Sequence, residues 1–519
     1  MTSSTGNLTS TAPEPTPPDR SSRIFARHRY DADLKRTAVR GAAVTGVSQA
    51  GKMVLRFGST AILARLLSPE DYGLVAMTAV ITGFVAIFRD AGLTTATVQR
   101  EEITHSQIST LFWINVALGG FTALLLAALS PAVAAFYQDS RLVPVTAALA
   151  IGFVFSGLTV QHQALLRRQM RFMALAVIDL VSMLVGVIVA VLMARAGFRY
   201  WSLVGMNLSM AVANTVAVWW MLDWRPGRPR RDPTVRPMLK FGSDVLGFDV
   251  INYFARQADT LLIGWWWGAV TLGLYDRAYN MLLMPIRQIN APLAAVAVPA
   301  LSRARNNPSQ FCHYYLNSLQ LVTSVSVPFV LVLALFADEF VRLWLGPGWE
   351  ECAALFRLLA VAAAIGAMSN PIGWLLLSLG QTRRYRQMGM ISSAVVVLSF
   401  LIGLPHGARG VAIAYSTSLA LLFIPTWLYV LKETDIRLLK IMRTLLPPLA
   451  SCVPATAVAL VALRYTPTTI PWLGALLGAI GFGLVYLFVL LVVFRRWRFF
   501  QGILNQFRRG GPKISDPTR

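Results

Sequence analysis

The segment GAAVTGVSQAGKMVLRFGSTAILARLL, residues 41–67, decides the fold class. It is largely apolar and, at a helical rise of about 1.5 Å per residue, long enough to cross a hydrocarbon core of about 30 Å. Lys52 and Arg56 lie near its middle, where inserting a cation costs roughly 2.5–3.5 kcal/mol. Such residues normally face a bundle interior or a water-filled cavity. The segment therefore predicts a membrane protein that holds or moves something anionic.

The composition of the whole chain agrees with this class. Of 519 residues, 55% are hydrophobic and 14% charged, which leaves too little polar surface for a soluble globule. Apolar runs of roughly 20 residues predict an all-α polytopic protein with about fourteen transmembrane helices and both termini on one side. The predicted spans are 41–67, 71–98, 108–130, 143–165, 172–195, 200–222, 238–263, 273–300, 318–337, 352–379, 386–404, 408–431, 443–463 and 471–494.

The positive charge follows the predicted topology. A net charge of +23 would indicate a nucleic-acid partner only if it lay on one folded surface. Instead, most of the 47 Lys and Arg residues lie in the segments that share a side with both termini. Since basic residues are enriched in cytoplasmic loops, both termini are expected in the cytoplasm and no nucleic-acid partner is expected.

The spans divide into two sets of six. The Pro-rich stretch WRPGRPRRDPTVRPMLK, residues 224–240, separates them and is expected to be an irregular cytoplasmic linker. The predicted parts are a disordered basic cytoplasmic tail (1–40), an N-terminal six-helix lobe (41–223), the linker (224–240), a C-terminal six-helix lobe (241–431), two accessory helices (432–494) and a second basic cytoplasmic tail (495–519).

A faint internal repeat relates the two sets. Arg56 precedes DYGL, residues 71–74, and then Arg89, while Arg256 precedes LGLY, residues 272–275, and then Arg287. A repeat spaced by about 200 residues is expected of a transporter built from two related bundles.

Cations inside the spans are the candidate binding residues. Lys52 and Arg56, four residues apart, share one helix face. Arg256 lies in a stripe with Asp249 and Asp259, and Arg287 follows Pro285 near the middle of its span. A proline at that depth favours a helix that lines a cavity or bends.

Each cation has an alternative structural role. Lys52 and Arg56 could pair with an acid on another helix, with Asp90, Asp179 and Asp249 as candidates, and Arg256 could pair with Asp259 within its own helix. The sequence does not choose between these roles. The four aspartates, Asp90, Asp179, Asp249 and Asp259, are candidates for counter-ions or for coupling to H⁺ or Na⁺.

Signals of catalysis are missing from the sequence. Cys312, Cys352 and Cys452 are isolated, which predicts neither a disulfide framework nor a metal site. The sequence lacks GxSxG, HExxH and P-loop motifs, and its connections are too short for a soluble catalytic domain. We therefore expect no enzyme and no bound cofactor.

Four strings resemble one family of transporters. They are LLSPEDYGLVAM (66–77), FRDAGLTTATVQR (88–100), LGLYDRAYNMLLMPIRQI (272–289) and VAVPALSR (296–303). Together they resemble the Wzx-type polysaccharide exporters, in particular the branch that contains the colanic acid exporter. The resemblance covers the first twelve spans and implies the fold of the multidrug/oligosaccharidyl-lipid/polysaccharide superfamily, with two six-helix lobes around a central cavity and alternating access.

The resemblance also implies a function. Family members flip undecaprenyl-diphosphate-linked oligosaccharide across the bacterial inner membrane for exopolysaccharide, O-antigen or capsule synthesis, beside polymerase and export proteins. A diphosphate suits Arg and Lys, so Lys52, Arg56, Arg256 and Arg287 are expected to line a cationic cavity. The alternatives are a multidrug exporter or a peptidoglycan-precursor flippase of the same fold, and an assembly subunit that transports nothing.

Overall fold

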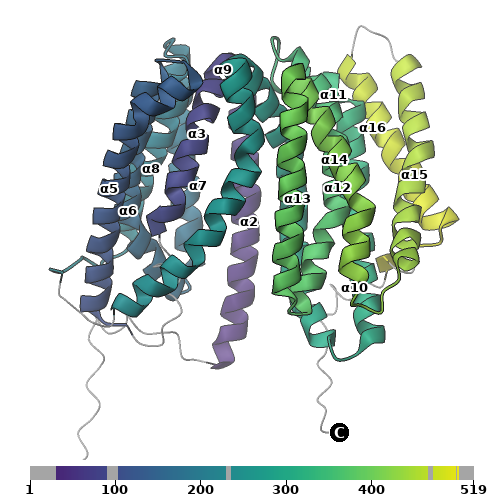
Figure 1. The fold of residues 1–519 in the computed structure, drawn as a ribbon, viewed down its shortest axis with the longest axis horizontal. Helices are drawn as coiled ribbons and strands as arrows, with labels where there is room; N and C mark the ends of the chain where they lie inside the picture. Colours follow the sequence, from purple (N-terminus) through teal and green to yellow (C-terminus); the bar gives the residue numbers. More distant parts are fainter. Residues whose placement is uncertain are drawn as a thin grey trace, which may run out of the picture.

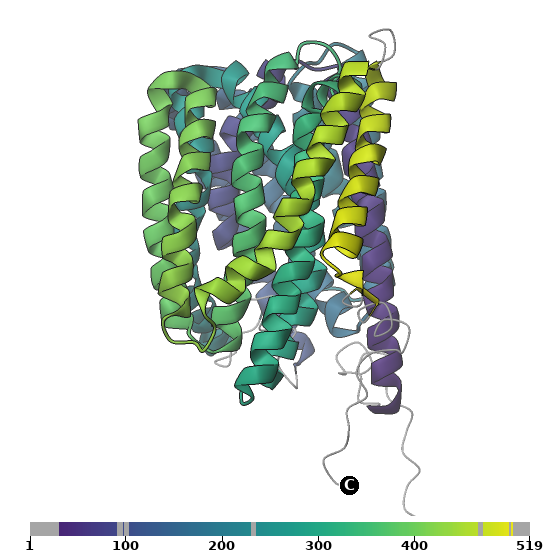
Figure 2. The same ribbon diagram turned by 90° about the vertical axis from the view of Figure 1, so that its right-hand side faces the viewer.

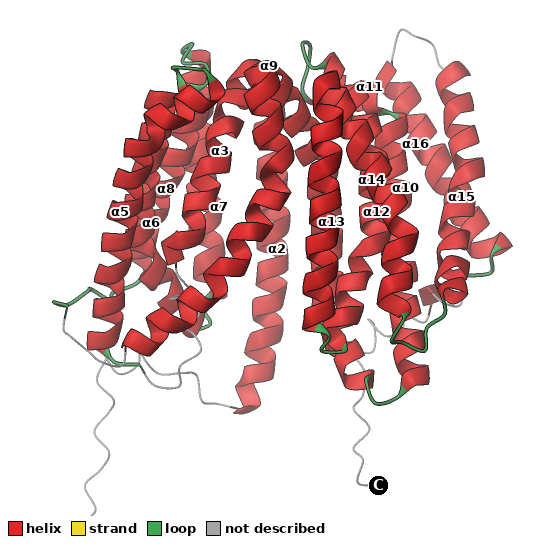
Figure 3. Ribbon diagram, in the orientation of Figure 1, coloured by secondary structure: helices red, strands yellow, loops and turns green. Residues whose placement is uncertain are grey.

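The protein is a bundle of long helices. The computed structural model describes residues 31–90, 97, 103–229, 235–465, 471–497 and 500–501, and these residues contain helices, turns and loops but no strand (Figure 3). Within this part of the chain, eleven helical segments are long and apolar enough to cross a membrane. The prediction of an all-helical, multi-pass membrane protein is confirmed.

Among the described residues before 222, six long helices form the first half of the bundle. The segment predicted at 172–195 is helical over those same residues, whereas α2 begins ten residues before its predicted start and α5 ends seven residues beyond its predicted end. The helices are α2 (Asp31–Ala64), α3 (Pro69–Asp90), α5 (His105–Tyr137), α6 (Leu142–Arg168), α7 (Phe172–Arg195) and α8 (Trp201–Met221).

The helix α9 (Val235–Ala304) consists of two antiparallel arms. Its backbone is non-helical at Gly268, where φ is 77° and ψ is −173°. The Tyr275 hydroxyl donates to Asp259 Oδ2 at 3.0 Å, although residues sixteen apart in a straight helix would be separated by about 24 Å. The chain therefore folds back at Gly268 into an ascending arm (235–267) and a descending arm (269–304), in agreement with the two predicted spans. Pro285 causes no break in the descending arm.

The second half of the bundle follows the same pattern. Hydropathy alone misplaces the start of α10 by ten residues, because its first turns are polar, and misses the short helix α11. The elements are α10 (Pro308–Leu335), α11 (Ala337–Trp344), α12 (Glu350–Ser378), α13 (Thr382–Gly403), the 3₁₀ turn η1 (Leu404–His406), α14 (Gly407–Leu431), α15 (Leu438–Tyr465), α16 (Pro471–Phe488) and the π turn η2 (Val489–Val493).

The helices form two groups that meet at α9, and we count its descending arm, which leads into α10, with the second group. In Figure 1, α3 and α5 to α8 lie on the left, α2 lies near the centre, α10 to α14 lie on the right, and α15 and α16 form the outermost pair. Figure 2 shows the same bundle from its right-hand side, with α15 and α16 next to the viewer. We call the end at which α2 ends and α3 begins the upper end, because it is uppermost in Figure 1.

Two glycines bring the groups into backbone contact at the upper end. A Cβ atom on Gly73 of α3 would lie 1.7 Å from the carbonyl oxygen of Ala269, and one on Gly273 would lie 1.9 Å from that of Pro69. The contact is reciprocal, since residues 69 and 73 meet residues 273 and 269. Its offset of 200 residues equals the spacing of the repeat. Only glycine permits helices to cross this closely.

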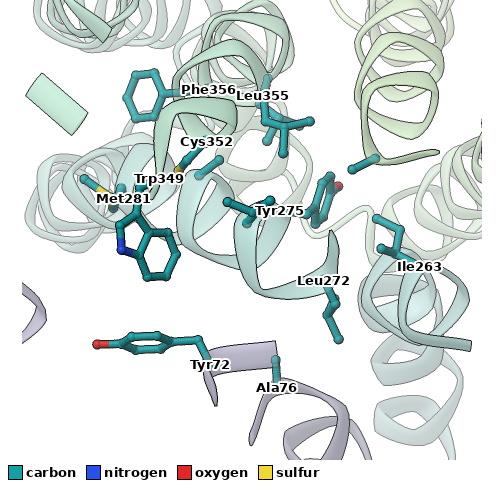
Figure 4. Close-up of a cluster of buried hydrophobic side chains, with 14 of the residues drawn as sticks. Tyr72, Ala76, Ile263, Leu272, Tyr275, Met281, Trp349, Cys352, Leu355 and Phe356 are labelled. Carbon is teal, nitrogen blue, oxygen red and sulfur yellow. The ribbon is translucent and has the colours of Figure 1, made fainter. Parts of the chain in front are cut away.

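Buried side chains surround this crossing, and we call the region the upper seam. Tyr72, Trp349 and Cys352 belong to it and are at most 5% exposed (Figure 4). The Trp349 indole donates to the carbonyl oxygen of Ala64 at 3.0 Å, and its ring meets that of Tyr72 edge to face, with 5.5 Å between centroids. The upper seam therefore joins α2 and α3 to α9 and α12.

Candidate functional site

Arg56 and Arg256 occupy equivalent positions in the two halves. Each lies twelve residues before its upper turn, at Ser68 or Gly268, which is about 18 Å along a helix. Both side chains are exposed, and among the described side chains neither is within 4 Å of a carboxylate. The alternative pair between Arg256 and Asp259 is not observed. Because a guanidinium at this depth is costly against lipid, both arginines require a hydrated space.

Lys52 is the cation whose structural alternative is observed. Its ammonium forms a short ion pair with Asp179 of α7. One of the three acids considered from the sequence is therefore its counter-ion. Lys52 is partly neutralised, whereas Arg56, one turn further along α2, remains without an acid in the described part of the chain.

Arg287 lies beside a group of tyrosines on the descending arm and α14. Its side chain is exposed, and Tyr279 and Tyr415 lie near it. The ring of Tyr279 stacks on that of Tyr275, with 5.9 Å between centroids. These neutral rings support the guanidinium without supplying an anion, which leaves its charge available to a ligand.

Asp259 is a buried carboxylate held only by neutral groups. Its side chain is 4% exposed. Oδ1 accepts from the Thr260 amide at 2.7 Å and from the Thr260 hydroxyl at 3.3 Å, and Oδ2 accepts from Tyr275. No cation lies within ion-pair distance in the described residues. A buried acid with hydrogen bonds but no counter-ion can exist in either protonation state.

The side chains of the candidate acids Asp90 and Asp249, and of Arg89 in the internal repeat, lie outside the described residues.

Sequence reasoning missed one cation near the upper seam. Arg277 is not among the cations proposed from the sequence, yet its guanidinium lies over the ring of Tyr72 at 4.4 Å. Since Tyr72 belongs to α3, this contact spans the two groups of helices. The only feature of the sequence that points to this contact is the repeat, which aligns Tyr72 and Gly73 with the start of the descending arm.

Ion pairs also connect the elements on the upper face. Arg141 binds Asp139 and Glu70, and Arg199 reaches Glu70 at 3.2 Å. Hydrogen bonds from Arg141 hold the pKa of Asp139, in the turn between α5 and α6, below its ordinary value of 3.8. Trp265, Trp266 and Trp267 at the Gly268 turn are all more than 40% exposed, as expected for an interfacial aromatic belt.

The described helices define a multi-pass membrane protein. Solved structures share the fold: "Lipid II flippase MurJ, inward closed conformation" has a TM-score of 0.69 at 13% identity and covers 88% of this chain and 99% of its own. An inward-facing multidrug resistance MATE family transporter of the MOP superfamily has a TM-score of 0.58 at 14% identity and covers 74% and 96%.

The chain belongs to the polysaccharide biosynthesis protein family, whose model matches residues 62–354. Among its relatives, teichuronic acid biosynthesis protein TuaB of Bacillus subtilis is 27% identical over 66% of this chain and 71% of its own. Lipopolysaccharide biosynthesis protein WzxC of Escherichia coli is 25% identical over 74% and 78%. The predicted family is confirmed, and it is a family of membrane proteins of polysaccharide synthesis, not of enzymes.

Proposed function

We propose that the protein flips a diphosphate-linked oligosaccharide, carried on a polyisoprenyl lipid, across the bacterial inner membrane. Its relatives are named for the synthesis or transport of lipopolysaccharide, teichuronic acid and succinoglycan, and the fold is that of a lipid II flippase. Such a substrate combines an anionic diphosphate with a hydrophilic glycan and an apolar tail. Arginine forks suit the diphosphate, a hydrated cavity suits the glycan, and the tail can stay in lipid.

The proposed topology has fourteen spans. Two of the eleven apolar segments, Arg256–Ala304 and Thr382–Leu431, are each a pair of antiparallel spans, and α2 supplies one more. The basic segments at the lower end favour a cytoplasmic location for both termini, with the upper end outside. The division at residues 224–240 then gives two six-helix lobes around a central cavity, and α15 and α16 are accessory.

The observation that carries this proposal is the symmetry of Arg56 and Arg256. The 200-residue offset that relates the two glycines at the upper seam also relates these two exposed cations. If a two-fold axis passes through the seam, both arginines face the same space from opposite lobes. With Arg287, and with Lys52 beside them, they form a cationic site of the charge that a diphosphate requires.

The aspartates have separate proposed roles. Asp179 is the counter-ion of Lys52. Asp259, buried and without a cation, is the proposed site at which a proton or Na⁺ from outside couples to transport, since moving one charge across 100 mV is worth roughly 2.3 kcal/mol. Asp90 and Asp249 remain candidates for the same roles. Polymerase and export proteins are the proposed partners that consume the flipped lipid.

Substitution of the three arginines tests the proposal. We expect Arg56→Ala, Arg256→Ala and Arg287→Ala each to accumulate in the membrane at near wild-type levels and to reduce polymer export. The control is Arg409→Ala, which removes a half-exposed ion pair with Glu351 on the upper face and should leave export unchanged. If the three variants export polymer normally, or if they fail to accumulate, the arginines do not bind substrate.

A further inference from the structure

Arg277 is a cation outside the proposed site of Arg56, Arg256, Arg287 and Lys52. It lies on the descending arm nine residues below the Gly268 turn, about 13 Å along a helix, and ten residues above Arg287. Its side chain is 21% exposed. It is therefore closer to the upper end than any cation of the proposed site.

The partners of Arg277 leave its hydrogen-bonding capacity partly unused. Nη2 pairs with Asp276 Oδ2 at 2.7 Å, while Asp276 Oδ1 is occupied by the Asn280 amide. Within the described part of the chain, neither the buried Nε atom nor the buried hydroxyl of Tyr72 has an acceptor. A guanidinium offers five donors, and leaving buried ones unpaired is costly.

The face of the guanidinium is covered from the opposite group of helices. The Tyr72 ring of α3 lies over it at 4.4 Å, and Tyr72 is held in turn against Trp349. Asp276 and Asn280, by contrast, belong to the same arm as Arg277 and would move with it. Movement of α3 away from the descending arm would uncover the guanidinium.

We propose that Arg277 is a second oxyanion site, which binds the substrate diphosphate in the state that opens at the upper end. In the state described above, the Tyr72 ring covers the face of the guanidinium and Asp276 accepts from its Nη2. Once that ring has withdrawn, Nε and the free side of the fork can donate to phosphate oxygens. The diphosphate then passes from Arg287 and Arg256 to Arg277 on its way to the outer leaflet. This inference rests on the proposed function.

The test measures binding of a defined probe in two states of the seam. Farnesyl diphosphate carries the diphosphate and a short isoprenyl tail without the glycan. Tyr72→Leu removes the cation–π contact and loosens the upper seam without changing any charge. In protein reconstituted in nanodiscs, we expect Arg277→Gln to weaken farnesyl diphosphate binding at least tenfold in the Tyr72→Leu background and less than twofold in the wild-type background.

Two further variants separate a binding role from a structural one. Arg277→Lys keeps the charge and should retain most of the affinity in the Tyr72→Leu background, whereas loss of folding would affect both substitutions. Arg409→Gln, at a surface ion pair, should leave binding unchanged in either background.

The outcomes distinguish this inference from the proposed function. If Arg277→Gln weakens binding equally in both backgrounds, or in neither, while Arg256→Gln weakens it in both, then Arg277 is a structural residue and the flippase proposal stands. If the wild-type protein and the Tyr72→Leu variant bind no farnesyl diphosphate at all, the flippase proposal itself fails.

Discussion

The reciprocal glycine contact predicts that a larger residue at Gly73 opens the upper seam, and labelling of a native cysteine can measure this opening. In Gly73→Ala, the new Cβ would lie 1.7 Å from the carbonyl oxygen of Ala269 and 2.5 Å from its carbonyl carbon. Ordinary contacts of this kind begin near 3.4 Å, so α3 and the descending arm must move apart by roughly 1.5–2 Å. Overpacking of this kind typically costs about 1–3 kcal/mol. The cost falls only on the state in which the upper seam is closed.

A cost of that size should change the population of the open state measurably. At about 1.4 kcal/mol per tenfold change, it shifts the equilibrium roughly 5- to 150-fold. Cys352 lies in the upper seam and is fully buried when the seam is closed. In a background with Cys312 and Cys452 replaced by alanine, its rate of labelling by a membrane-impermeant thiol reagent should rise by the same factor.

The matched control is Gly366→Ala in the middle of α12. A Cβ there meets nothing within 4 Å, so this variant gains the same helix propensity, up to about 1 kcal/mol, without a clash. It should label like the parent protein. Equal labelling rates for the variants at residues 73 and 366 would refute the account of the crossing, because they would show that the two helices do not meet closely in the membrane.

Three further predictions concern single ionic groups. Lys52→Met and Asp179→Leu should each lower thermal stability, while the double variant should recover most of the loss, giving a coupling of about 1–2 kcal/mol in a double-mutant cycle; additive losses would contradict the pair. Asp259→Asn should leave farnesyl diphosphate binding within twofold but remove the acceleration of transport by a pH or Na⁺ gradient, and a variant that still responds to both gradients would exclude coupling at this carboxylate. The pKa of Asp139 is lowered in the folded state, so its carboxylate stabilises the fold at pH values above its ordinary pKa of 3.8 and loses that contribution as the pH falls below it. The Tm difference between wild type and Asp139→Asn should therefore be present near pH 7 and shrink in acid. A difference that grows in acid would be inconsistent with the observed pair.

Much of the fold can be predicted from hydropathy, because each span is an apolar run bounded by polar turns. The runs fail where that contrast is weak. The first turns of α10 carry polar residues such as His313 and Asn317, so the predicted start is ten residues late. The short helix α11 itself contains Asp338, Glu339 and Arg342, so hydropathy assigns it to a loop.

The site is less predictable than the fold because it depends on contacts between distant residues. The sequence offers three acids as possible counter-ions of Lys52. Only the packing of α2 against α7 selects Asp179, which is 127 residues away. Arg56 and Arg256 could be proposed because their cost in the membrane is visible in the sequence alone. The contact of Arg277 with Tyr72 could not, because it exists only where α3 crosses the descending arm.

The most direct test of the central claim is reconstituted transport. Proteoliposomes would contain a fluorescent oligosaccharide linked through a diphosphate to a polyisoprenyl lipid, and quenching by an impermeant reagent would report the leaflet in which it lies. The account predicts rapid, protein-dependent exchange between leaflets by the wild-type protein and at least tenfold slower exchange by Arg56→Gln/Arg256→Gln. Exchange no faster than in protein-free vesicles, or equal rates for the two proteins, would contradict it.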